Sequence, residues 1–233
     1  MKLLAIDTAT QACGLALTED NRLVAEYRLI AKNIHNEQLV IIIEHLTSDA
    51  RWHLTELSGI VFSMGPGSFT GLRIGLAVCK GLAFTLSVPL VTVNSLDALA
   101  YNGRYWRGRV CAMIKARAEE LYVAQYQSDA KRLQRCTDYK ILDLNSISDY
   151  LTEETLIVSY PREIGLSLGG NKNVIVSETD SFPSPLAVAE LGYTKLQNQE
   201  TEDIESLEPF YLQDFKPKRK VYNYDSPLHT QPV

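Results

Sequence analysis

The sequence predicts an α/β protein of two lobes, each built on a mixed five-stranded sheet flanked by helices. Two observations lead to this fold class. The first half of the chain follows the order β-β-β-α-β-α-β-α, in which three antiparallel strands precede two crossover connections. The second half repeats this order of elements without a visible sequence repeat.

The first lobe is assigned to residues 1–103. Alternating and apolar runs predict strands at 2–6, 12–17, 22–30, 59–63 and 90–93, and helices at 36–49, 68–86 and 95–101. Glu19-Asp20-Asn21 forms the expected hairpin turn between the second and third strands. Ser95 is the expected cap of the last helix.

The second lobe is assigned to residues 104–215. Strands are predicted at 109–114, 121–127, 138–142, 156–158 and 173–176, and helices at 144–151, 162–168 and 185–196. Residues 216–233 are expected to form a flexible tail. Its basic cluster at 216–220 leaves open a second interpretation, in which the tail touches RNA.

Composition limits the function classes. The formal net charge of −5 argues against a broad, nonspecific nucleic-acid surface. The four cysteines are dispersed without a CxxC pair, which is typical of free thiols in a reducing compartment. No signal peptide and no apolar run long enough for a membrane span is recognised. We therefore expect a cytoplasmic protein with no membrane contact.

A glycine-rich segment at 65–75 follows a predicted buried strand and enters a predicted helix. Such a turn can hold a phosphate, because the N-terminus of a helix offers free N–H groups. The residues after Gly71 are Leu72 and Arg73, whereas a P-loop requires Lys followed by Ser or Thr. The spacing of a dinucleotide-binding loop is exceeded by one residue.

The same helix carries small residues at every fourth position. Gly71, Gly75, Cys79 and Ala83 form one ridge. Glycine inside a helix costs about 1 kcal/mol relative to alanine, so the pattern indicates a close approach by another element. Packing against another helix is the interpretation that the pattern favours over phosphate binding.

The predicted helix at 36–49 has more apolar residues than one face requires. Leu39, Ile42, Ile43 and Leu46 share a face that should pack on the sheet. Val40 and Ile41 lie off that face, which indicates a second covered surface. The cover is either a partner or another part of this chain, such as residues 51–57.

No complete active site is visible in the sequence. Asp7 ends the first strand, where it would hold a metal or nucleotide or simply cap a turn. Lys115 stands at the matching strand end of the second lobe, where it cannot ligate Mg²⁺ as a carboxylate would. The histidines lack metal-binding spacing, and the serines lack a nucleophile elbow. We therefore expect no metal and no cofactor.

Three segments resemble the TsaB (YeaZ) family: Leu-Ala-Ile-Asp-Thr-Ala-Thr at 4–10, the glycine-rich segment at 65–75 and the strand region at 88–96. The resemblance extends over roughly residues 1–127. It implies an actin, sugar-kinase and Hsp70-like fold with RNase-H-like lobes. It also implies a role in making threonylcarbamoyladenosine on tRNAs that read ANN codons.

The resemblance implies a scaffold and activator rather than an enzyme. Family members form homodimers and also heterodimers with the catalytic relative TsaD, through first-lobe helices; the ATPase TsaE then joins, and tRNA is contacted indirectly. The interface residues that this assigns to the present chain are His35, Leu39, Val40, Ile41, Phe69, Thr70, Gly71, Arg73, Ile74, Gly75, Val78 and Cys79.

The resemblance also implies that the metal site of TsaD is absent here, because Ser95 and Leu99 stand at its two histidine positions. A vestigial nucleotide cleft would comprise Asp7, Thr8, Gly65, Gly67 and Lys115. The chain departs from the family at Lys115, where an aspartate is usual, and at Gln213, where an arginine is usual. The alternatives are a nucleotide-binding, kinase-like ATPase or a metalloprotease-like protein of the same fold.

Overall fold

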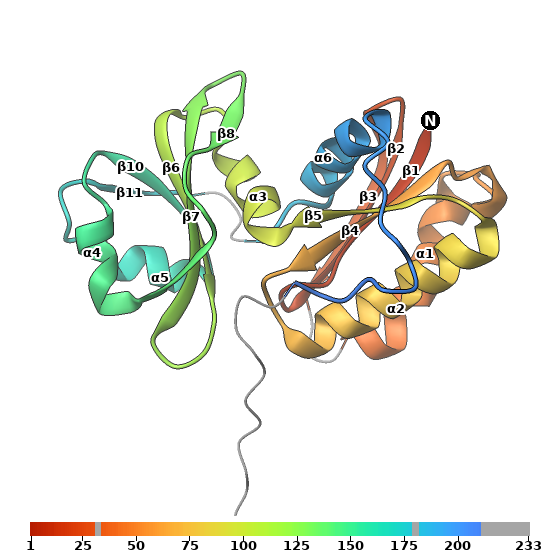
Figure 1. Ribbon diagram of the computed structural model, residues 1–233, viewed down its shortest axis with the longest axis horizontal. Coiled ribbons are helices and arrows are strands. Elements are labelled where there is room, and N and C mark those ends of the chain that lie inside the picture. Colours follow the sequence, from red (N-terminus) through yellow and green to blue (C-terminus); the bar gives the residue numbers. More distant parts are fainter. Residues whose placement is uncertain (31–33, 179–181, 211–233) are drawn as a thin grey trace, which may run out of the picture.

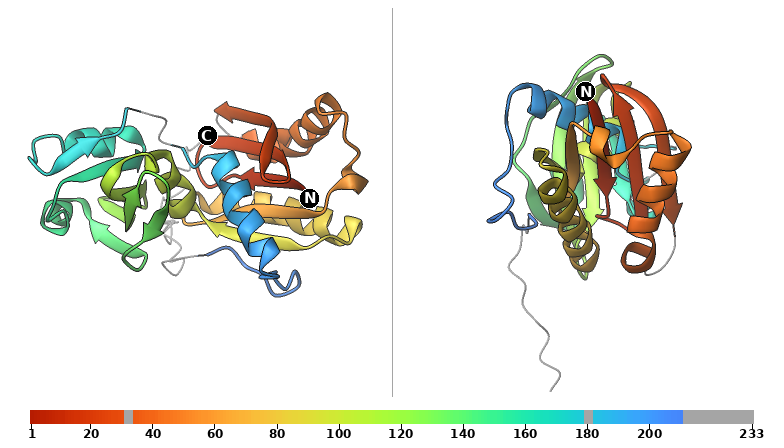
Figure 2. Two further views of the ribbon diagram at one scale, coloured as in Figure 1. Left: turned by 90° about the horizontal axis from the view of Figure 1, so that it is seen from above. Right: turned by 90° about the vertical axis from the view of Figure 1, so that its right-hand side faces the viewer.

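Two lobes, each with its own β-sheet, lie side by side in the computed structural model (Figure 1). The structure describes residues 1–30, 34–178 and 182–210. The predicted tail at 216–233, its basic cluster and Gln213 lie outside these residues. Seen from above and from the side, the helices of the first lobe cover both faces of its sheet (Figure 2).

The first sheet has five strands, as predicted. They are β1 (Lys2–Asp7), β2 (Ala12–Glu19), β3 (Arg22–Ile30), β4 (Gly59–Gly65) and β5 (Leu90–Asn94), in the order β3-β2-β1-β4-β5. β1 pairs antiparallel with β2 and parallel with β4, so the sheet is mixed. Helices α1 (Ile34–Asp49) and α2 (Phe69–Leu86) cover one face, and α6 (Pro185–Gln197) covers the other.

Strand β1 shows how the sequence fixes these layers. Leu4 and Ile6 belong to the core beneath α1 and α2. Leu3 and Ala5 belong to the core beneath α6. Since side chains alternate along a strand, an uninterrupted apolar strand is what a sheet covered on both faces requires.

The second sheet has six strands, not the predicted five. They are β6 (Arg107–Lys115), β7 (Glu120–Asp129), β8 (Leu133–Arg135), β9 (Lys140–Asp143), β10 (Thr155–Tyr160) and β11 (Val174–Val176), in the order β11-β10-β6-β7-β8 with β9 also on β7. The remaining helices are α3 (Ser95–Ala100), α4 (Ile147–Tyr150) and α5 (Arg162–Ser167), and short 3-10 turns form at Leu54–Glu56, Tyr101–Gly103 and Leu144–Ser146.

The extra strand arises because the pairing along one side of β7 is interrupted. β8 pairs with one end of β7 and β9 with the other. Between them the Cys136 N–H donates to the Gln125 carbonyl, but the Gln125 N–H donates to the Thr137 side chain at 2.9 Å rather than to a backbone oxygen. The side chain therefore interrupts the ladder, and two short strands occupy the place of one.

Helix α3 joins the lobes. Its Leu96 and Leu99 pack on the second sheet, whereas Ala98 packs against α6 and the first sheet. The Asp97 carboxylate accepts hydrogen bonds from Tyr126 and Tyr139 of the second lobe, at 2.7 and 2.8 Å. A helix of six residues thus holds both sheets through apolar and polar contacts.

The assignment of residues 104–215 to the second lobe is wrong for its last part. Helix α6 packs on β1, β2, β4 and β5 of the first sheet. The following segment stays with this lobe, since Glu202 N–H donates to Leu90 O at 2.9 Å and Phe210 N–H to Met64 O at 3.1 Å. The periodicity of a helix predicts its apolar face but not which sheet that face covers.

Helix α2 bears on the expectation that the sequence has no apolar run long enough for a membrane span. Among the described residues it is the one helix whose length and composition would allow it to cross a membrane. Only 33% of its residues are buried. Leu72, Leu76, Cys79 and Ala83 belong to the core beneath this helix, and Phe84 is its large exposed apolar residue.

Candidate interaction surface and interlobe cleft

The glycine-rich loop before α2 is occupied by the turn between β1 and β2. The Ser68 N–H donates to the Ala9 carbonyl at 2.7 Å, and the Gly71 N–H donates to the Ser68 side chain at 3.3 Å. A Cβ atom at Gly67 would lie 2.2 Å from Ala9 O. Two N–H groups that a phosphate would need are therefore already used, and the glycine serves contact with the protein's own backbone.

The glycine ridge of α2 faces inward. A Cβ atom at Gly75 would lie 2.3 Å from Thr8 Oγ1 and 2.6 Å from Phe62 Cε2. Thr8 also donates to the Gly71 carbonyl at 2.8 Å. Gly71, Gly75 and Cys79 are buried against the lobe's own sheet, so their proposed contact with a partner is wrong.

Leu39 requires the same correction. It is 2% exposed and belongs to the core beneath α1 and α2. Its neighbours Val40 and Ile41 are 62% and 42% exposed, although they are apolar. The expected cover for these two side chains is therefore not supplied by the described part of this chain. The side chain of His35 lies outside the described residues.

The remaining predicted interface residues all belong to α2, and two of them, Ile74 and Val78, also pack against the core that α1 and α2 cover. Thr70 and Arg73 are exposed, and Phe69, Ile74 and Val78 are half-buried. The Arg73 guanidinium lies 4.0 Å from the centre of the Phe69 ring. We call the following set the α1–α2 face: Val40, Ile41, Phe69, Thr70, Arg73, Ile74, Val78 and Phe84.

Phe84 was not identified from the sequence. It is 80% exposed, the highest value among the large exposed hydrophobic residues described. The signal was available, because Thr70, Arg73, Ala77, Gly81 and Phe84 follow one another at intervals of three and four residues. A Cβ atom at Gly81 would meet nothing within 4 Å. The exposed small residues of α2 are thus Ala77 and Gly81.

Asp7 lies at the end of β1, and it is 1% exposed. Burial raises the pKa of Asp7 to about 7, against the opposing effects of hydrogen bonds from Ser63 and the Ala9 backbone and of the Arg28 charge. Its Oδ1 atom has no hydrogen-bond partner among the described residues. The carboxyl group is thus enclosed rather than presented to a ligand.

The five predicted cleft residues come from both lobes, and contacts between the lobes are not described for Lys115. Asp7, Thr8, Gly65 and Gly67 come together around the β1–β2 turn and the start of α2. Lys115 is half-buried at the end of β6, and its ammonium group makes no ion pair in the described part of the chain. The cation that lowers the Asp7 pKa is Arg28 on β3.

The two positions aligned with metal-binding histidines are both buried. The Ser95 hydroxyl is hydrogen-bonded to the Ser63 hydroxyl at 2.8 Å. Leu99 is fully buried in the core between α3 and the second sheet. No group of three or more His, Cys, Asp or Glu side chains is placed for a metal within residues 1–30, 34–178 and 182–210.

Residues 29–216 match a family model described as tRNA N6-adenosine threonylcarbamoyltransferase, TsaD. The chain is 32% identical to the tRNA threonylcarbamoyladenosine biosynthesis protein TsaB of Bacillus subtilis, over 91% of this chain and 94% of that protein. It is 37% identical to the Escherichia coli protein of the same description, over 55% of this chain and 56% of that protein.

Solved structures show the same relationship. YeaZ from Pseudomonas aeruginosa matches with a TM-score of 0.77 and 26% identity, over 91% of this chain and 99% of that chain. The ethanolamine utilization protein EutJ from Carboxydothermus hydrogenoformans matches with a TM-score of 0.51 and 14% identity, over 82% of this chain and 90% of that chain. The predicted actin- and sugar-kinase-like fold is confirmed.

Proposed function

The chain belongs to the TsaB (YeaZ) family, and we propose that it is the non-catalytic scaffold and activator of the complex that makes threonylcarbamoyladenosine on tRNA. In this proposal the α1–α2 face pairs with the catalytic relative TsaD, and the ATPase TsaE joins the resulting complex. Contact with tRNA is indirect. A cytoplasmic location remains a prediction.

The observation that carries the proposal is the exposed apolar α1–α2 face. Val40, Ile41 and Phe84 are 62%, 42% and 80% exposed on adjacent helices. Large apolar side chains exposed on two neighbouring helices are what an interaction site would offer, and in this proposal the three belong to one such site. The exposed surface at the middle of α2 carries only the small residues Ala77 and Gly81, so the axis of another helix could approach it closely.

The identity of the partner is supported by the family model. The chain matches the TsaD model over residues 29–216, so the two proteins share the architecture that carries α1 and α2. A face that pairs two copies about a two-fold axis is self-complementary. The equivalent helices of a relative with the same architecture can take the place of the second copy. The homodimer and the TsaD heterodimer then compete for one face.

A non-catalytic role is supported by the residues at the aligned metal positions and by the hydrogen bonds of the glycine-rich segment. Ser95 and Leu99 cannot supply imidazole nitrogens to a metal. The N–H groups of Ser68 and Gly71 are engaged within the protein, which weakens the nucleotide-binding alternative. In the proposal the chain therefore acts by holding TsaD in an active arrangement and uses no cofactor of its own.

The test combines a reconstituted modification reaction with an association measurement. Ile41→Glu introduces a carboxylate into the α1–α2 face. Association through this face would bury that carboxylate without a partner, which is strongly unfavourable. Leu166→Glu, on α5 of the second lobe, is the matched control, since Leu166 is 54% exposed outside that face. We expect Ile41→Glu to lose TsaD binding in sedimentation velocity and to lose stimulation of tRNA modification, and Leu166→Glu to keep both.

Three results would contradict the proposal. Modification that proceeds equally well without this chain, at fixed TsaD and TsaE, would remove the activator role. Turnover of Mg-ATP by the isolated chain at a rate typical of enzymes would favour the nucleotide-binding alternative. Retained TsaD binding by Ile41→Glu would place the interface elsewhere.

A further inference from the structure

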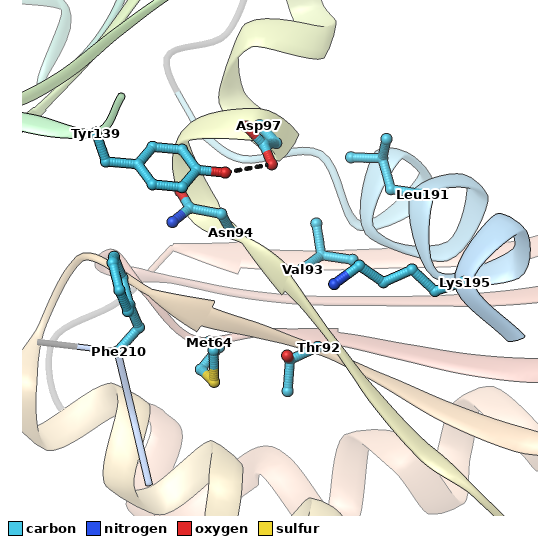
Figure 3. Close-up of a pocket in the computed structure, with 9 residues that line it drawn as sticks. All are labelled: Met64, Thr92, Val93, Asn94, Asp97, Tyr139, Leu191, Lys195 and Phe210. Atoms are coloured by element: carbon cyan, nitrogen blue, oxygen red, sulfur yellow. Dashed lines mark hydrogen bonds between the residues drawn. The ribbon is translucent and has the colours of Figure 1, made fainter. Parts of the chain in front are cut away.

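A cavity of about 270 Å³ lies where β5, α6 and the second lobe meet (Figure 3). It shares no residue with the α1–α2 face. Its walls come from sequence segments far apart: Asn94 ends β5, Lys195 belongs to α6, Tyr139 precedes β9 and Phe210 closes the described chain. This size is just below that of pockets for drug-sized ligands, so the cavity suits a smaller organic molecule.

Two donors in the cavity wall are unused. The Lys195 side chain extends from α6 toward Val93 in the cavity wall (Figure 3), and its ammonium group has no hydrogen bond or ion pair in the described part of the chain. The Asn94 carbonyl oxygen caps the Leu96 N–H at 2.9 Å, but the Asn94 amide NH₂ has no partner among the described residues. Unused donors of this kind call for an acceptor on the ligand.

The acidic groups nearby are already engaged. Asp97 accepts hydrogen bonds from Tyr126 and Tyr139. Glu202 accepts one from Thr92, which lines the cavity. Their negative charge disfavours a dianion such as a phosphate monoester, whereas a single carboxylate can be held by Lys195 alone. The ligand charge that the cavity fits best is therefore −1.

The rest of the wall is apolar and partly aromatic. Met64, Val93 and Leu191 contribute aliphatic surface, and the rings of Tyr139 and Phe210 lie edge to face with their centres 6.0 Å apart. We propose that this cavity binds a small organic monocarboxylate with a flat or branched apolar body. Lys195 binds the carboxylate, the Asn94 amide donates to it, and the apolar body contacts Met64, Val93 and Leu191.

Such a ligand would couple the lobes. Tyr139 belongs to the second lobe, whereas Asn94, Leu191 and Lys195 belong to elements of the first. When the apolar body of the ligand also contacts the Tyr139 ring, which lines the cavity, the ligand touches both lobes and stabilises the arrangement in which the Tyr139–Asp97 hydrogen bond is made. Binding should therefore raise the midpoint of thermal unfolding of the whole chain.

The experiment uses 3-phenylpropanoate as the probe and 3-phenylpropanamide as its neutral match. Saturation-transfer NMR and chemical-shift titration are recorded on the full chain. We expect saturable binding of the acid and at least about tenfold weaker binding of the amide, since a hydrogen bond to a charged group is lost. Lys195→Met should remove this preference for the acid. Lys172→Met, an exposed lysine of the second lobe, should leave it unchanged.

Leu191→Trp is the second variant, because an indole ring would fill the cavity. It should abolish binding of the acid while circular dichroism confirms the fold. The proposal is overturned if wild-type protein shows no saturable binding up to the solubility of the acid, or if acid and amide bind equally. It is also overturned if Lys195→Met binds the acid as tightly as Lys172→Met does.

Discussion

Gly75 on α2 faces Phe62 on β4 so closely that a Cβ atom at residue 75 would lie 2.6 Å from Phe62 Cε2. Phe62 is fully buried, and it is among the largest side chains in the core. The glycine therefore sets how near α2 can lie to the sheet, because the large ring takes the space that a side chain on the helix would need. The small residue belongs to the interior of the lobe rather than to an interface between chains.

Gly75→Ala should therefore destabilise the folded chain. Overpacking of a close-packed site costs about 1–3 kcal/mol in free energy of unfolding. Gly81→Ala is the matched control on the same helix, since its Cβ atom enters open space. The control should raise stability by up to about 1 kcal/mol, because alanine favours a helix. Urea unfolding followed by circular dichroism measures both changes, and equal effects of the two variants would contradict the assignment.

Gly81→Leu should weaken association and leave the fold intact. The added side chain projects into solvent in the single chain, but it would separate two helices that meet over Ala77 and Gly81. Sedimentation velocity at several concentrations measures the dissociation constants of the proposed homodimer and of the proposed complex with TsaD. A dissociation constant at least about tenfold higher corresponds to a loss of about 1.4 kcal/mol. Unchanged association would show that the centre of α2 lies outside the contact.

Local patterns allowed much of the fold to be predicted. Period-two and continuous apolar runs located the strands of the first sheet, and the helix at 68–86 agrees with α2 to within one residue. The strand β8 was missed because three residues carry too little periodicity. The Thr137 side chain that breaks the edge of β7 acts through a long-range hydrogen bond, which no local pattern predicts.

The candidate site was predicted less well, since it depends on which face of a helix is covered. The repeat of Gly71, Gly75 and Cys79 indicated a close approach correctly, but it did not tell that the approaching side chain is Phe62 of the same lobe. Val40 and Ile41 were identified because their own helix already had a complete apolar face. The cavity beside Lys195 joins four distant segments, so its formation requires the tertiary structure.

Tyr126→Phe should weaken the contact between the lobes. The variant removes one of two hydroxyl donors to Asp97 and leaves the buried ring in place. A hydrogen bond to a charged group contributes about 1.5–3 kcal/mol, so the free energy of unfolding should fall by about that amount. Tyr139→Phe should cost less, because Tyr139 is half-buried. Tyr105→Phe, at a 72% exposed side chain, is the control and should change stability by less than about 0.5 kcal/mol.

Asp7→Asn should stabilise the chain at pH 8 but have little effect at pH 4. The pKa of Asp7 is raised from 3.8 to about 7 by burial, so between these values the folded chain keeps a proton that the unfolded chain has lost. The free energy of unfolding therefore falls as pH rises from about 4 to about 7, and this contribution levels off above about 7. At 1.36 kcal/mol for each pKa unit, the loss removed by the substitution reaches about 4 kcal/mol.

Urea unfolding at pH 4, 6 and 8 measures the difference between Asp7→Asn and the wild-type chain. Ser63 can still donate to the amide oxygen, which keeps the local hydrogen bond to this side chain. Asp149→Asn, on the surface of α4, controls for the loss of one negative charge. A stabilisation by Asp7→Asn that is the same at all three pH values would show that the buried carboxyl does not carry the proton. A stabilisation that grows with pH identifies Asp7 as a carboxyl group whose burial destabilises the fold above its pKa, even though Ser63 and the Ala9 backbone donate hydrogen bonds to it.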